Sequence, residues 1–248
     1  PSGPLSVIDF YNAGGVPAVM KRLESILHVN EKTLLNNTWG EYLKNIVIKD
    51  TNVIKALDKP YSNIAGMRIL KGNLAERGAV CRPTGVPEKM RKFKGKARVF
   101  NQEEFAAQAV MKGEVREGDV IVIRYEGPKG SPGMNELMKA TDSLIAKGLE
   151  EKIALITDAR FSGFNHGTII GHVAPEAMVG GLIAFVEDGD VIEYSIPDGY
   201  LNLVVPQEII EKRKKNWVKP EPKIKSGVLA LYGATCRSAD EGAAMQNW

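Results

Sequence analysis

Two glycine-rich loops that follow apolar strand patterns carry the residues best suited to chemistry. The first runs from Tyr125 to Glu136, and its glycines and prolines fix an irregular path that lets the backbone approach a ligand closely. Glu136 is expected in the first turn of the next helix, where its carboxylate could ligate a hard cation such as magnesium. From spacing alone, the favoured alternative is that Glu136 merely complements the helix dipole.

The second loop begins at Asp158 and contains Ser162 between a strand and a glycine, where a hydroxyl could act as an exposed nucleophile or base. It lacks the G-x-S-x-G frame of hydrolases because Arg160 occupies the first glycine position. Asp158 and Arg160 could orient the loop or bind a substrate carboxylate. The favoured alternative from residues alone is an ordinary serine in a glycine turn, and His166 is more typical of a structural histidine.

The elements around these loops predict a mixed α/β domain. Apolar runs at 119–125 and 152–157 predict buried strands, and a helix is expected from about 134 to 147. If the two strands run parallel, both loops open on the same edge of the sheet. A further strand at 98–100 precedes a helix that Asn101 can cap, with Glu104 as its capping-box partner and Gly113 as its end.

Later segments alternate apolar strands with turn residues, at 182–187, 191–196 and 200–205. We therefore expect a β-barrel-like carboxy-terminal domain with surrounding helices over residues 51–248. Residues 1–50 read as a short helical segment from the end of an amino-terminal domain or a linker, with a second helix pattern at roughly 31–45. The opening residues Pro1-Ser2-Gly3-Pro4 predict a fragment of a longer protein.

Composition excludes several classes of partner. The net charge is +3, from 33 basic and 30 acidic residues, which predicts no nucleic-acid binding. The densest basic run, residues 212–215, follows an apolar helical pattern and predicts a solvated helix end. Two cysteines, Cys81 and Cys236, favour the reducing cytoplasm and cannot alone hold an iron–sulfur cluster. No apolar run approaches the length of a membrane span.

Several segments resemble the dihydroxy-acid dehydratase family, which also includes phosphogluconate and sugar-acid dehydratases. The resemblance rests on motifs that occur in order along nearly the whole chain: RYEGPKG at 124–130 with PGM at 132–134, TDARFSG at 157–163, GHVAPEA at 171–177, KGNLA at 71–75 and AGGVPAVM at 13–20. It implies a hydro-lyase that converts a 2,3-dihydroxy acid to a 2-keto acid. In that family magnesium stabilises charge on the substrate carboxylate and an iron–sulfur cluster binds the leaving hydroxide.

By this resemblance, Ser162 matches the proposed catalytic base, acting as an alkoxide, and Glu136 matches a magnesium ligand. Substrate-binding roles are expected in the same loop, for Arg160, Gly163, Phe164, Asn165 and His166. The cluster cysteines and the other magnesium ligands belong to the family's amino-terminal domain. The chain alone is therefore expected to be inactive, with that domain as its partner, and the complete enzyme is expected to be a homodimer.

The motifs do not agree on the class of substrate. The Tyr125-Glu126-Gly127 form favours the branched-chain amino-acid enzymes, whereas Asp158-Ala159-Arg160 is shared with sugar-acid enzymes. Within the second loop, the residues at 164–166 depart from the branched-chain pattern. Dihydroxy-acid dehydration is the first hypothesis and gluconate-type dehydration the second. A third, of another class, is a binding or assembly module that has kept the fold without catalysis.

Overall fold

The computed structural model describes residues 4–162 and 166–246, and the chain divides into two compact units, Pro1–Asn63 and Ile64–Trp248. The first unit contains short helices α1 (Val7–Asn12), α2 (Gly15–Arg22) and α3 (Trp39–Leu43) and the 3-10 turn η1 (Glu24–Ile26). From the sequence, residues 1–50 are assigned to the end of an amino-terminal domain or a linker, and residues 51–248 to a carboxy-terminal domain. That assignment stays a prediction.

The helical character expected for the first unit is confirmed, although in shorter pieces than the pattern suggests. The helix expected at roughly 31–45 is reduced to five residues. A tight turn precedes it, in which Asn36 has φ 63° and the Thr33 N–H donates to the Asn37 carbonyl at 2.8 Å. The Thr38 side chain then caps α3 in a capping box with Glu41, so the helix begins only after that turn.

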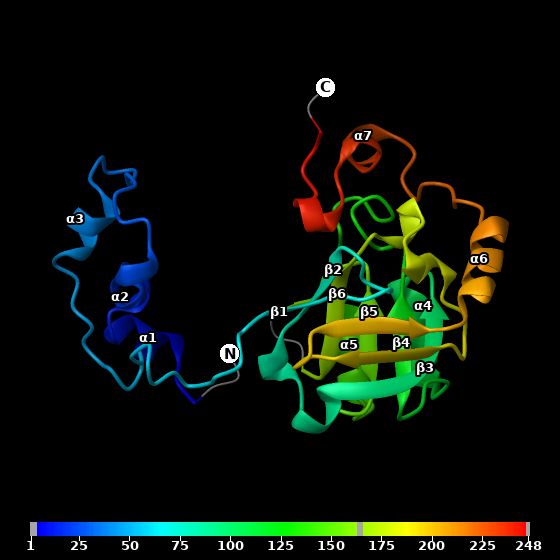
Figure 1. Ribbon diagram of the computed structural model, residues 1–248, viewed down its shortest axis with the longest axis horizontal. Coiled ribbons are helices and arrows are strands. Elements are labelled where there is room, and N and C mark those ends of the chain that lie inside the picture. The colour runs from blue at the N-terminus through cyan, green and yellow to red at the C-terminus, as the bar shows by residue number, and fades with distance from the viewer. Residues whose placement is uncertain (1–3, 163–165, 247–248) are drawn as a thin grey trace. The chain divides into compact units, whose positions relative to one another are not determined.

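The second unit is built on one sheet, which in the described residues has eight strands in the order β1-β2-β6-β5-β4-β3-β7-β8 (Figure 1). Neighbours from β3 through β4 and β5 to β6 pair in parallel, and the remaining pairs are antiparallel. The strands are β1 (Arg68–Leu70), β2 (Gly78–Cys81), β3 (Lys92–Phe100), β4 (Asp119–Ile123), β5 (Ala154–Thr157), β6 (Thr168–Ala174), β7 (Val191–Ser195) and β8 (Tyr200–Val204).

The two edges of this sheet meet just beyond β1. Lys71 forms a parallel bridge with Tyr200, in which the Lys71 N–H donates to the Gly199 carbonyl at 2.9 Å and the Leu201 N–H donates to the Lys71 carbonyl at 3.0 Å. The Asn73 side chain extends the join, because it donates to the Leu203 carbonyl at 2.9 Å and accepts from the Leu203 N–H at 2.7 Å. The predicted barrel-like α/β fold is therefore confirmed, as a nearly closed barrel.

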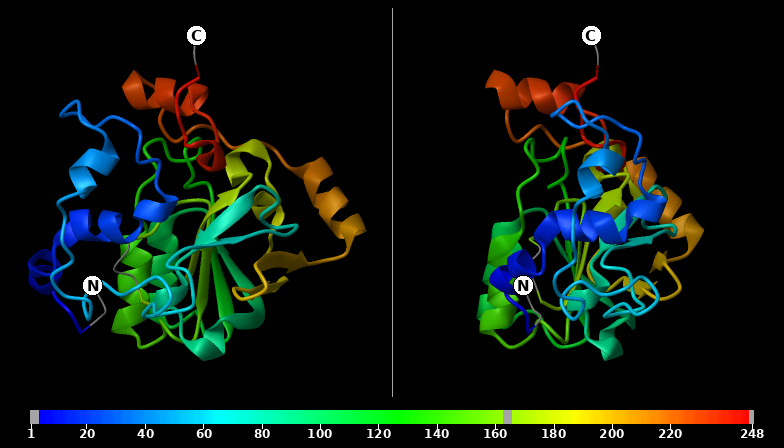
Figure 2. Two further views of the ribbon diagram at one scale, coloured as in Figure 1. Left: turned by 60° about the vertical axis from the view of Figure 1, so that its left-hand side comes forward. Right: turned by 90° about the vertical axis from the view of Figure 1, so that its left-hand side faces the viewer.

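Alternation along the strands divides the buried residues between two cores. In β4, Val120 and Val122 face the barrel interior, whereas Ile121 and Ile123 pack outward against α4 (Glu103–Lys112) and α5 (Met138–Ala146). Strands buried on both faces explain the continuous apolar runs in the sequence. Figure 2 shows the green helices α4 and α5 on one side of the sheet and the orange α6 (Gln207–Asn216) on the other.

Short turns and one further helix complete the described part of the second unit. The helix is α7 (Gly227–Thr235), and none of its residues is buried. The 3-10 turns are η2 (Pro83–Gly85), η3 (Glu88–Met90), η4 (Ala177–Val179), η5 (Leu182–Phe185) and η6 (Ala239–Glu241). Within the described residues, no helix combines the length and apolar character that crossing a membrane requires.

Two predicted local features are wrong for the same reason. Residues 182–187 form no strand, since Leu182–Phe185 make the 3-10 turn η5. Asn101 does not cap α4, whose N-cap is Gln102 without a side-chain hydrogen bond. The Arg124 guanidinium binds both segments, because it donates to the Asn101 side chain at 2.8 Å and to the Ala184 carbonyl at 2.6 Å. A long-range contact thus overrides both local patterns. The predicted end of α4 at Gly113 is confirmed, with φ 77°.

The basic run in α6 is only partly the solvated helix end that was predicted. Its three lysines are exposed, but Arg213 donates to both carboxylate oxygens of Asp190, at 2.5 and 3.0 Å. The two side chains are 15% and 10% exposed, so this bidentate ion pair is largely removed from water. Arg213 therefore joins α6 to the barrel, which periodicity alone does not indicate.

Gly72 provides a test of the barrel closure. A Cβ atom at this position would lie 2.1 Å from the Leu201 carbonyl oxygen and 2.4 Å from the Asn202 side-chain oxygen. We expect Gly72→Ala to lower the free energy of unfolding by about 2 kcal/mol or more, because either the join opens or the backbone shifts. Urea denaturation measures this, with Gly66→Ala as the control, since no atom lies within 4 Å there. Equal stability of the two variants would contradict the closure.

Candidate active site at the ends of β4 and β5

The parallel arrangement that the two loops require is confirmed. Strands β4 and β5 pair in parallel, with Ile123 opposite Thr157 at their carboxyl ends. The first loop leaves β4 at Arg124 and the second leaves β5 at Asp158, so both start at neighbouring points on one edge of the sheet. The loops therefore open at the same end of the barrel.

The loops pair again further along. Glu136 and Arg160 form a parallel bridge, and the Leu137 N–H donates to the Arg160 carbonyl at 3.1 Å. The exposed Arg160 side chain adds a hydrogen bond from its Nε to the Met134 carbonyl at 2.5 Å. Glu136 and Ser162, which are 26 positions apart in the sequence, thus belong to two backbone segments that run side by side.

Glu136 does not lie in the first helical turn, contrary to the sequence prediction. Helix α5 begins at Met138 with Leu137 as its N-cap, because the backbone at Glu136 is engaged in the bridge to Arg160. The Glu136 side chain is exposed. This position gives its carboxylate access to a ligand.

Ser162 is half-buried, and its neighbour Phe161 packs against the outer core. The Phe161 ring lies over Gly171 in β6, where any Cβ atom would be 2.6 Å from the ring. His166 is exposed, and the loop rejoins the barrel at Gly167, whose N–H donates to the Gly85 carbonyl at 3.1 Å. Three predicted substrate-binding residues lie outside the described residues: Gly163, Phe164 and Asn165.

Asp158 is a buried anchor for three segments. Its fully buried carboxylate accepts hydrogen bonds from the backbone N–H groups of Tyr125 at 3.1 Å, Glu126 at 3.0 Å and Ala177 at 2.9 Å. Burial raises the pKa of the Asp158 carboxyl, and the three backbone donors oppose that rise. Of the two roles considered for Asp158, the structure shows loop orientation.

Glu176, to which sequence reasoning gave no role, is a second buried anchor. Its carboxylate accepts from the Lys129 N–H at 3.1 and 3.2 Å and from the Gly130 N–H at 3.1 Å, and the side chain is 1% exposed. Burial, aided by the negative charge of Asp158, raises the pKa of Glu176 from 4.5 to about 7. The one sequence feature that could have indicated this role is the charged Glu176 within the largely apolar segment GHVAPEA at 171–177.

The chain after α6 also contacts the first loop. The Trp217 indole N–H donates to the Tyr125 hydroxyl at 3.1 Å, and the Lys223 ammonium donates to the Glu126 carboxylate at 2.8 Å. Gly233 in α7 lies against Pro132, where a Cβ atom would be 2.6 Å from the ring. The first loop is therefore covered by the carboxy-terminal segment as well as held from below.

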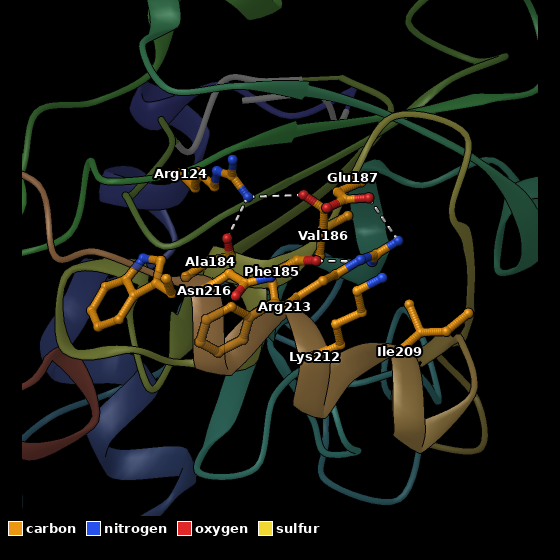
Figure 3. A pocket seen from close by; sticks show the side chains of 10 residues that line it. Arg124, Ala184, Phe185, Val186, Glu187, Ile209, Lys212, Arg213 and Asn216 are labelled. Atoms are coloured by element: carbon orange, nitrogen blue, oxygen red, sulfur yellow. Dashed lines mark hydrogen bonds and ion pairs between the residues drawn. The ribbon is translucent and has the colours of Figure 1, made fainter.

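A cavity of about 400 Å³ lies beside α6 and is lined in part by Arg124, where the first loop leaves β4. Figure 3 shows its lining side chains, with Arg124 directed at the carbonyls of Ala184 and Val186 and Arg213 at the carbonyl of Phe185 and at Glu187. Because both guanidinium groups already have partners within the protein, this cavity offers little for an anionic ligand. The predicted loop residues remain the better candidates for chemistry.

Metal ligands are sparse in the described part of the chain, where no three His, Cys, Asp or Glu residues group to hold an ion. Cys81 is enclosed in the barrel core, and burial raises the pKa of its thiol to about 12. Cys236 is buried next to α7, where its sulfur lies 3.9 Å from the Gly233 carbonyl oxygen. Neither environment favours the thiolate that an iron–sulfur cluster requires, so a cluster does not fit these residues.

Comparison with known proteins agrees with the sequence motifs. Residues 52–243 match the family described as dihydroxy-acid/6-phosphogluconate dehydratase C-terminal. The chain is 46% identical to the dihydroxy-acid dehydratase of Acetivibrio thermocellus, with 100% of the chain and 45% of that protein aligned. It is 48% identical to that of Carboxydothermus hydrogenoformans, with 98% of the chain and 44% of that protein aligned.

The barrel, the two loops and this match together define the chain as a member of the dihydroxy-acid/6-phosphogluconate dehydratase family, carrying its carboxy-terminal domain. The chain spans somewhat less than half the length of the curated relatives it matches.

The raised pKa of Glu176 predicts a pH dependence of stability. Between pH 4.5 and about 7 the folded protein retains a proton that the unfolded chain has lost, so stability falls as pH rises through this window. At about 1.4 kcal/mol per pKa unit, the fall is on the order of 3 kcal/mol. Glu176→Gln should remove it, whereas the exposed Glu211→Gln should not. Urea denaturation from pH 5 to 8 tests this, and an unchanged slope in Glu176→Gln would refute it.

Proposed function

We propose that this chain is the carboxy-terminal part of a dihydroxy-acid dehydratase, a hydro-lyase that converts a 2,3-dihydroxy acid to a 2-keto acid. The observation that carries the proposal is the backbone bridge between Glu136 and Arg160, which joins the two motif-bearing loops at one end of the barrel. The names of the relatives support the reaction class. Because those proteins are about twice as long, activity would require the rest of the enzyme.

In this proposal the Ser162 oxygen accepts the proton from C2 of the substrate. The electron pair left at C2 forms the double bond to C3 as hydroxide leaves, and the resulting enol tautomerises to the 2-keto acid. Arg160, exposed at the mouth of the barrel, would bind the substrate carboxylate, with His166 and residues 163–165 nearby in the sequence. These assignments rest on the motif and on the placement of the loops.

The exposed Glu136 carboxylate fits one ligand position of a magnesium ion, which commonly takes only one or two protein carboxylates. When bound, magnesium would stabilise negative charge on the substrate carboxylate and favour ionisation of a nearby hydroxyl. The remaining ligands would come from outside this chain. We place the iron–sulfur cluster implied by the family outside it as well, and derive no step through it.

The amino-terminal domain of the same enzyme is the proposed partner, in a cytoplasmic homodimer that binds neither nucleic acid nor membranes. A gluconate-type sugar-acid substrate is the second candidate, favoured by Asp158-Ala159-Arg160 and by the departure at residues 164–166. Assaying the complete enzyme with both classes of substrate separates the two. Absence of turnover with either would favour the non-catalytic binding module.

Ser162→Ala tests the catalytic base in the complete enzyme. General bases typically contribute 10²- to 10⁴-fold, so we expect kcat to fall about 10³-fold. Stability should change by less than about 0.5 kcal/mol, because a half-buried loop hydroxyl contributes little to either core. The direct measurement is solvent deuterium exchange at C2 of the substrate, which should vanish. Persistent exchange would assign the base to another residue.

Glu136→Gln tests the magnesium ligand, because it removes the charge while keeping the volume. We expect kcat to fall about 100-fold or more at limiting magnesium, since a metal contributes several kcal/mol of charge stabilisation. Titration of magnesium against activity should show a higher concentration at half-maximal rate. Exposed Glu117→Gln, beside β4 at the other end of the barrel, is the matched control. Wild-type behaviour of Glu136→Gln would exclude this role.

A further inference from the structure

The first loop, residues 125–136, is fixed at its beginning, its middle and its end. The Asp158 carboxylate binds the backbone at Tyr125 and Glu126, and the Glu176 carboxylate binds it at Lys129 and Gly130. The end of the loop pairs with the backbone of Arg160. All three attachments connect the loop to segments that follow β5 and β6.

The loop backbone lies directly on these carboxylates. A Cβ atom on Gly127 would be 2.5 Å from a carboxylate oxygen of Glu176, and one on Gly130 would be 2.6 Å from the Tyr125 carbonyl oxygen. The glycines therefore allow the chain to fold back on itself above Glu176. Such contact leaves the loop little freedom to move while Glu176 keeps its position.

Burying two carboxylates against the same loop lowers the free energy of unfolding, because each loses its hydration. The desolvation of each disfavours its charged form, and the hydrogen bonds that the structure assigns to Asp158 and Glu176 come from backbone N–H groups. The edges of the barrel join elsewhere, through Lys71. The hydrogen bonds of the two carboxylates go to the first loop and to Ala177 at the start of η4.

We propose that Asp158 and Glu176 are positioning residues of the dehydration site, which together fix the first loop against the second and so set the Glu136 carboxylate relative to the Ser162 hydroxyl. The inference rests on the proposed function. Asp158 is suited to this because it precedes Ser162 by four positions in one loop while it binds the start of the other. Glu176 completes the arrangement from the segment after β6, which Asp158 also binds through the Ala177 N–H.

The experiment uses the complete enzyme with Glu176 replaced by alanine or by glutamine. The assays are run at pH 8, above the Glu176 pKa of about 7, so that the wild-type carboxyl is ionised. Glutamine then keeps the volume and one acceptor oxygen but loses the charge, and a neutral acceptor forms a hydrogen bond roughly half as strong. Asp190→Asn is the matched control, since Asp190 is also a largely buried carboxylate but binds α6 instead of the loops. The readouts are kcat, KM, the melting temperature, and amide hydrogen exchange at residues 125–131.

A displacement of about 1 Å at a catalytic group can cost 100-fold in rate. We therefore expect kcat to fall about 100-fold in Glu176→Ala and about 10-fold in Glu176→Gln, with KM changed less than about threefold. Amide exchange at Lys129 and Gly130 should accelerate in the same order. Asp190→Asn should lower the melting temperature while kcat and exchange in the loop stay within about twofold of wild type.

Unchanged amide exchange at Lys129 and Gly130 in Glu176→Gln would overturn the proposal, as would a wild-type kcat despite faster exchange. A loss of kcat in Asp190→Asn equal to that in Glu176→Gln would also overturn it, because general destabilisation would then explain both. If the wild-type enzyme dehydrates neither class of substrate, the proposed function fails, whereas the exchange data still report whether Glu176 holds the loop.

Discussion

The parallel pairing of β4 with β5 sets Ile123 beside Thr157, and the candidate site depends on this register. It makes the two glycine-rich loops leave the sheet at neighbouring points, so that they can pair again at Glu136 and Arg160. A shift by one residue would reverse the faces of β4, moving Val120 and Val122 out of the barrel interior. The apolar packing on both faces of the strand therefore fixes the register, and the register fixes the site.

Buried charge has different uses in different parts of this molecule. Asp190 is paired with Arg213, so a bidentate ion pair attaches α6 to the barrel. Asp158 and Glu176 instead accept hydrogen bonds from the backbone N–H groups of loops that have no regular structure of their own. Irregular loops leave backbone donors without partners, and carboxylates supply acceptors where strands and helices do not.

The sequence predicted the family and the main strands and helices more successfully than the long-range contacts around the loops. The motifs identified the family, and the apolar runs predicted β4, β5 and α5 to within a few residues. Errors occurred where a distant residue replaced a local partner, as when Arg124 bound Asn101 and the backbone of 183–186. The contacts of Glu176 were missed because they join it to backbone groups 46 and 47 positions away, which periodicity cannot detect.

The sequence by itself determined the family, the strand and helix types of the longest apolar segments, and the glycine positions that allow close backbone approach, because these follow from side-chain chemistry and local periodicity. Only the tertiary structure decided that the barrel closes through Lys71 and Tyr200, that Glu136 lies before its helix, and that two buried carboxylates hold the loops. These features require groups far apart in the chain to meet, and their hydrogen bonds exist only after the cores have packed.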